Sequence, residues 1–287
     1  MSRLLACPPI RLTHDAIMAW LDDRAPSLGA ALAYYTLFSL APLLLIAVSV
    51  AGLVFGDQAA RGQIYEQLSG FMGPAGAKVV EQLLASVNWP AGSMTGTLFG
   101  LLIMFIGATT VFAELQSALD RIWEAPEAPR SGLWSLLRAR VLSFGLVLGL
   151  GFLLIVSLLF GVAVAALQKW WLAGLAAWSL VLGALNFLIS FLLLTLMFAM
   201  IYKLMPRVRI AWADVWVGAL VTAGLFSAGR SVIGLYLGYS AVASGFGAAS
   251  SLVVLLVWIY YSAQIFLLGA EFTWAYAHRY GSLRQSS

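Results

Sequence analysis

The amino-acid sequence predicts an all-α membrane protein with six transmembrane helices and both termini in the cytoplasm. Hydrophobic residues make up 62% of its 287 residues and charged residues only 10%, whereas soluble domains carry about 25% charged residues. Six apolar runs are each long enough to span a bilayer, which takes about 20 helical residues. Lys and Arg are concentrated in alternate connections, as the positive-inside rule requires.

Residues 1–27 precede the first span. They are polar and lack the basic, apolar and small-residue order of a cleavable signal peptide, so the first span is expected to act as an uncleaved anchor. Ile10, Ile17, Trp20 and Leu21 can share one face of a helix, which predicts a helix lying in the cytoplasmic membrane interface. A partner-binding role for this helix is the alternative.

Residues 28–277 form the transmembrane domain, and residues 278–287 form a cytoplasmic tail. Pro42 interrupts the first span and frees a backbone carbonyl about one turn earlier, so it marks either a hinge or a static kink. The long external connection, residues 56–94, has two amphipathic segments separated by a Gly-Pro pair, which predicts a helical hairpin; a solvated loop with helical turns is the alternative. The six predicted spans are Leu28–Phe55, Thr95–Leu119, Arg140–Leu167, Trp178–Leu204, Trp212–Leu237 and Ala248–Ala277.

The distribution of cations sets the predicted orientation. Twelve of the sixteen Lys and Arg residues lie on the side of the termini, three lie on the opposite side, and Arg230 lies within the fifth span. This bias places both termini in the cytoplasm. It also explains the net charge of +4 as topology and contact with anionic headgroups rather than as nucleic-acid binding. The cytoplasmic basic rim includes Arg121, Lys203, Arg207 and Arg209.

Three charged residues lie more than one helical turn from either end of a predicted span: Glu114, Glu271 and Arg230. A charge at membrane depth costs about 2.5–3.5 kcal/mol on insertion scales, so it usually faces a protein interior, a partner or water. With Asn186 and Gln264, these residues could line a pathway for a proton, an anion or a lipid headgroup. The alternative is structural: helix ends and cations of the basic rim satisfy the two glutamates, and Arg230 extends to the outer interface.

Other classes of site have little support in the sequence. Cys7 is the only cysteine, so an intramolecular disulfide is impossible, and His14 and His278 show no metal-ligand spacing. Metal-dependent nucleases need clustered carboxylates or histidines, and there is neither a phosphate-binding glycine motif nor a soluble RNA-binding domain. We therefore expect no metal, no cofactor, no nucleic-acid partner and no enzymatic activity.

Four segments of the chain are long and distinctive: LGAALAYYTLFSLAP at Leu28–Pro42, GATTVFAELQSALDRIW at Gly107–Trp123, DVWVGALVTAGLF at Asp214–Phe226 and GFGAASSLVVLLVWIYYSAQIFLLGAEFT at Gly245–Thr273. They resemble the YihY/BrkB family of bacterial inner-membrane proteins. The resemblance extends over about residues 15–277, and Glu114 and Glu271 lie inside the shared segments. It implies a six-span inner-membrane protein. Members formerly carried the label ribonuclease BN, which is widely regarded as a misassignment, and they are discussed as transporters, including of lipids.

Together, the residues and the resemblance predict an inner-membrane, transporter-like protein for a lipid or an amphiphilic anion, with proton coupling through Glu114 or Glu271. A membrane scaffold or envelope-assembly partner that transports nothing is the alternative. The expected partners are membrane lipids and, beyond them, a second copy of the chain or an envelope protein.

Overall fold

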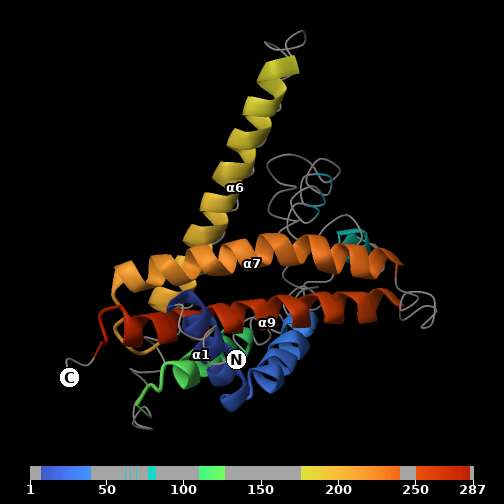
Figure 1. The fold of residues 1–287 in the computed structure, drawn as a ribbon. Helices are drawn as coiled ribbons and strands as arrows, with labels where there is room; N and C mark the ends of the chain where they lie inside the picture. Colours follow the sequence, from blue (N-terminus) through green and yellow to red (C-terminus); the bar gives the residue numbers. More distant parts are fainter. Residues whose placement is uncertain are drawn as a thin grey trace, which may run out of the picture. The chain divides into compact units, whose positions relative to one another are not determined.

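The computed structural model describes residues 8–39, 62, 65, 69, 77–81, 110–126, 176–239 and 250–284. Regular structure in these ranges is helical and they contain no strand, in agreement with the predicted all-α class. The main helices are α1 (Pro8–Asp22), α6 (Ala176–Leu204), α7 (Trp212–Tyr239) and α9 (Ser250–Arg279), labelled in Figure 1.

Three of the described helices are long and apolar enough to cross a membrane. The candidate spans are Gly183–Leu204 in α6, Trp212–Tyr236 in α7 and Leu252–Arg279 in α9. They correspond to the fourth, fifth and sixth predicted spans. The third predicted span and most of the first two lie outside the described residues, so the number of six spans and the side of the termini stay predictions.

Two other predicted features are described only in part. In the external connection, residues 62, 65, 69 and 77–81 are helical, and the Gly-Pro pair of the expected hairpin lies outside the described residues. Residues 25–39 are helical, and they include residues 28–39, the beginning of the first predicted span. Pro42, the predicted hinge, also lies outside the described residues.

The predicted N-terminal helix is α1, and a left-handed residue ends it. Arg24 has φ 54°, and its amide donates to the carbonyl oxygen of Leu21 at 3.0 Å. Left-handed residues commonly close helices in this way. The predicted apolar face needs one correction: Ile10 and Leu21 are exposed, whereas Trp20 is half-buried and its indole nitrogen is buried. Trp20 lies four residues after the buried Ala16 and shares that side of α1.

The described residues fall into two compact units. Unit 1 draws on Met1–Ala16, Ile122–Leu225 and Gly269–Ser287, and unit 2 draws on Ile17–Arg121 and Phe226–Leu268. Helices α1, α7 and α9 contribute residues to both units. Each unit therefore has its own contact between α7 and α9.

Unit 1 is packed where α1 meets the C-terminal part of α9. Leu12 and Ala16 of α1 and Ala275 of α9 form a buried cluster, surrounded by partly buried aromatic residues of α9. Leu12 and Ala16 are four residues apart and share one face of α1. The N-terminal helix is thus fixed to the last turns of a candidate membrane span.

Unit 2 is packed by larger side chains. Ile233 of α7 and Val254 of α9 form its buried cluster, and Trp258 and Tyr261 of α9 pack against it. The rings of Phe226 and Trp258 meet edge to face, with centroids 6.2 Å apart.

Candidate functional site

Glu271 is the buried carboxylate of α9, with 1% of its surface exposed. Residues four apart share a helix face, so Glu271 lies on the same face as the buried residues Leu267 and Ala275. Ala275 contacts Leu12 and Ala16 of α1. In chain order, the carboxylate therefore lies one turn before the contact of α9 with α1, farther from the end of the candidate span. Protein encloses it.

A different face of α9 meets α7 at a crossing built from glycine and threonine. Gly218 of α7 faces Thr273 of α9, and Gly269 of α9 faces Thr222 of α7. A Cβ at Gly218 would lie 1.7 Å from Oγ1 of Thr273, and a Cβ at Gly269 would lie 2.0 Å from Oγ1 of Thr222. The helices can approach this closely because neither glycine has a side chain.

The threonine hydroxyls of this crossing bond within their own helices. Thr222 donates to the carbonyl oxygen of Gly218, and Thr273 donates to that of Gly269, each at 2.7 Å. Tyr202 of α6 lies 3.0 Å from Oγ1 of Thr222. Because the single hydroxyl proton of Thr222 is directed to Gly218, Tyr202 is the donor in this pair. Helices α6 and α7 thus share a buried polar contact, and Gly269 of α9 packs against it.

Asp214 is a second buried carboxylate of unit 1, with 2% of its surface exposed. It lies in the first turn of α7, where a negative charge is favoured by the helix dipole. Its Oδ2 accepts hydrogen bonds from the amide of Ser282 at 3.0 Å and from the hydroxyl of Ser282 at 2.6 Å. A Cβ at Gly281 would lie 2.2 Å from Oδ1 of Asp214, so glycine is required there. These contacts fasten the segment after α9 to the beginning of α7.

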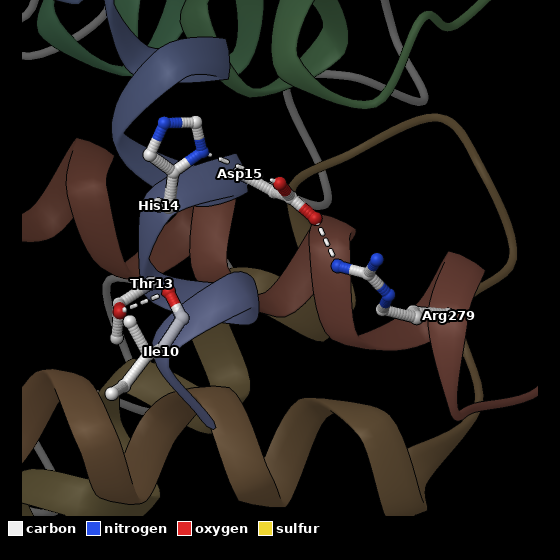
Figure 2. Close-up of polar contacts among 5 residues, drawn as sticks. All are labelled: Ile10, Thr13, His14, Asp15 and Arg279. Carbon is white, nitrogen blue, oxygen red and sulfur yellow. Dashed lines mark hydrogen bonds and ion pairs between the residues drawn. The ribbon is translucent and has the colours of Figure 1, made fainter. Parts of the chain in front are cut away.

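Asp15 links α1 to the end of α9. Its Oδ2 accepts a charge-assisted hydrogen bond from the guanidinium of Arg279, and its Oδ1 lies 3.6 Å from Nδ1 of His14 (Figure 2). All three side chains are well exposed, so the Asp15–Arg279 ion pair contributes only about 0–1 kcal/mol. This pair joins α1 to the last residue of α9.

The cations of the predicted basic rim have local contacts. Lys203 donates to the carbonyl oxygen of Ile210, and its ammonium lies 5.5 Å from the ring centroid of Trp212. Arg121 pairs with Asp23 at 3.5 Å. None of these contacts involves Glu114 or Glu271. Arg207 and Arg209 are exposed between α6 and α7.

Gln264 of unit 2 packs against the first helical segment. Its Nε2 lies 3.5 Å from the carbonyl oxygen of Pro26 and only 2.0 Å from where a Cβ at Gly29 would be. Its Oε1 is buried and accepts no hydrogen bond from the described residues. Glu114 and Arg230 of the same unit are half-buried.

The predicted pathway residues are divided between the two units. Glu271 and Asn186 belong to unit 1, where Asn186 is exposed, and Glu114, Arg230 and Gln264 belong to unit 2. A continuous pathway through all of them stays a prediction. Within the described ranges, no group of three or more His, Cys, Asp or Glu residues is arranged to hold a metal ion.

Comparison with known proteins identifies the family of this chain. The profile of the family described as virulence factor BrkB matches residues 16–287. The chain belongs to the BrkB family. This confirms the resemblance to the YihY/BrkB family. No solved structure matches the chain.

Curated relatives of this BrkB-family chain are named UPF0761 membrane protein. One from Alkalilimnicola ehrlichii is 29% identical, covering 87% of this chain and 54% of the relative. One from Alcanivorax borkumensis is also 29% identical, covering 92% of this chain and 61% of the relative. One from Pseudoalteromonas translucida is 28% identical, covering 88% of this chain and 81% of the relative. The chain thus spans little more than half of the first two relatives.

The sequence predictions missed the polar residues around the α7–α9 crossing and Asp214. The crossing does have a sequence signal: Gly-Ala is followed by Thr four residues after the glycine in both helices, at Gly218–Thr222 and at Gly269–Thr273. Asp214 has the weaker signal of an acidic residue at the beginning of a predicted span.

Proposed function

We propose that this BrkB-family chain is a multi-pass protein of the bacterial inner membrane that moves a lipid or an amphiphilic anion, coupled to a proton at Glu271. The supporting observation is the burial of Glu271 within a helix long and apolar enough to span a membrane. A carboxylate exchanges one proton, and at membrane depth the cost of its charge is about 2.5–3.5 kcal/mol. The charged form carries this cost and the protonated form does not, and a free-energy difference of this size is large enough to bias a conformational equilibrium.

The proposed substrate class follows from the charges at one end of unit 1. Arg207 and Arg209 are exposed in the connection between α6 and α7, and the exposed ring of Trp212 begins α7. Cations beside interfacial aromatic residues suit a molecule with an anionic head and an apolar tail. The proposal includes no enzymatic step, no cofactor and no nucleic-acid partner.

A non-transporting scaffold is the second candidate, and the α7–α9 crossing favours it. Gly218, Thr222, Gly269 and Thr273 pack with little free space, and the threonine hydroxyls have acceptors within their own helices. A closely packed joint of this kind suits a static bundle. Transport would then require movement elsewhere in the chain.

The two candidates differ in an assay of proteoliposomes. Labelled anionic phospholipid is reconstituted with the purified chain, and its movement between leaflets is followed with and without an imposed pH gradient. We expect movement above that in empty vesicles, and we expect Glu271→Gln to lose most of the stimulation by the gradient. Glu114→Gln and Arg230→Ala test the other two charged residues of the predicted pathway.

Glu124→Gln is the matched control, because Glu124 is exposed beyond the helical residues 110–122. It should behave as the wild type. No movement above empty vesicles by well-folded protein, under either condition, would support the scaffold. Unchanged gradient dependence in Glu271→Gln would exclude this residue as the proton carrier.

A further inference from the structure

The N-terminal helix has two apolar faces, and only one of them is covered. Leu12 and Ala16 are buried against α9. Ile10, Ile17 and Leu21 form a second stripe, because they are separated by seven and four residues. Their exposed fractions are 41%, 48% and 51%. This outward stripe lies on the opposite side of the helix from the covered face.

The polar residues of α1 occupy a flank between these two faces. Arg11, Asp15 and Asp22 share this flank by the same helical spacing. Asp15 reaches Arg279, the last residue of α9, whereas Ala16 contacts Ala275, which lies one turn earlier in α9. The polar flank is therefore directed toward the end of the candidate span.

Figure 2 shows α1 passing across α9 where Asp15 meets Arg279 in unit 1. If α9 crosses the bilayer, α1 lies close to the membrane plane at the level of the last turns of α9. Its outward stripe then faces sideways, away from α9, at the boundary between headgroups and acyl chains. Interfacial helices bury their apolar face at this depth.

Other residues at this end of unit 1 fit an anionic lipid surface. Trp212 and Tyr280 are exposed aromatic residues at the beginning of α7 and just after α9. Arg207, Arg209 and Arg284 are exposed nearby in the sequence, and the bonds from Ser282 to Asp214 bring the segment after α9 to the beginning of α7. Aromatic residues and cations together are typical of protein groups at lipid headgroups.

We propose that the stripe formed by Ile10, Ile17 and Leu21 docks into the monolayer of anionic phospholipid at the C-terminal end of α9, with the Asp15 flank in water. The inference concerns how the N-terminal helix is seated and does not depend on transport. A soluble partner or a second copy on the stripe are the competing occupants.

Single-cysteine labelling tests the docking. Cys7 is the only cysteine, so a Cys7→Ser background accepts one new position at a time. The Ile17→Cys and Asp22→Cys variants, labelled with an environment-sensitive fluorophore, are reconstituted in phosphatidylcholine vesicles with and without phosphatidylglycerol. We expect the Ile17 label to be quenched by lipids with shallow nitroxides and protected from aqueous iodide. The Asp22 label on the same helix should show the reverse, and phosphatidylglycerol should increase the difference.

Equal quenching of both labels by iodide would overturn the proposal. Cross-linking between copies through the Ile17→Cys variant would overturn it in favour of a second copy. Leu21→Cys repeats the test on the same stripe if Ile17→Cys does not fold. The wild-type chain provides an independent measurement, in which a photoactivatable anionic phospholipid should cross-link to α1, and its absence from α1 would also contradict the docking.

Discussion

The two contacts between α7 and α9 use different packing chemistry. In unit 1, Gly218 and Gly269 leave no room for a side chain, and threonines of the facing helix occupy the space. In unit 2, Ile233, Val254 and Trp258 pack as large apolar groups, and Gly229 of α7 faces the large side chains of Ile265 and Tyr261. The same pair of helices thus meets through glycines and threonines in one unit and mainly through large side chains in the other.

This difference matters because lipid replaces water around the helices. Burying an apolar side chain against another helix gains little when lipid tails are equally apolar, so close backbone packing and hydrogen bonds contribute more of the helix association. We therefore expect unit 1 to be sensitive to added volume and unit 2 to be less sensitive to lost volume. The following predictions test that contrast.

Adding one methyl group at the crossing should have the largest effect. Gly218→Ala and Gly269→Ala should each destabilise the chain by about 1–3 kcal/mol, because the new Cβ would overlap a threonine hydroxyl. Reversible unfolding in mixed micelles measures the free energy. Gly224→Ala is the matched control on α7: nothing lies within 4 Å of its Cβ position, so alanine should be neutral or stabilising by up to about 1 kcal/mol.

The overlap itself is tested by the double variant Gly218→Ala with Thr273→Gly, which exchanges the position of the small residue. Recovery of part of the lost stability in the double variant, relative to the two single changes, indicates direct contact. Strict additivity of the two effects would contradict the packing described at this crossing.

Removing volume in unit 2 should have an intermediate effect. Ile233→Ala creates a cavity, but the transfer contribution that makes such changes cost about 2–5 kcal/mol in water-soluble cores is largely absent in lipid. We expect a loss of about 1–2 kcal/mol in the same unfolding measurement. A loss larger than that of Gly218→Ala would reverse the contrast between the units.

Removing the polar contact from α6 should have the smallest effect. Tyr202→Phe deletes the hydroxyl that donates to Thr222 and leaves the hydrogen bond from Thr222 to Gly218 in place. Interhelical hydrogen bonds of this kind average about 0.6 kcal/mol, so we expect a loss near that value. A double-variant cycle with Thr222→Val measures the coupling free energy between the two hydroxyls. Zero coupling would show that this bond does not stabilise unit 1.

The sequence by itself was sufficient for the helical class, the family and the last three candidate spans. Long apolar runs such as that of α9 are decided by local composition, because each span must satisfy its own backbone hydrogen bonds within lipid. It also predicted the N-terminal helix, since apolar spacing in α1 is a local signal. It selected Glu271 on the cost of a charge at depth.

Tertiary structure alone decided which faces these helices cover. The sequence groups Ile10, Ile17, Trp20 and Leu21 on one face of α1, but the face that contacts α9 is formed by Leu12 and Ala16, and Ile10, Ile17 and Leu21 stay exposed. Likewise, Gly218 and Gly269 become essential only because the facing threonines occupy the space above them. The physical reason is that periodicity shows which residues share a side of one helix, whereas a partner for that side comes from residues far away in the chain.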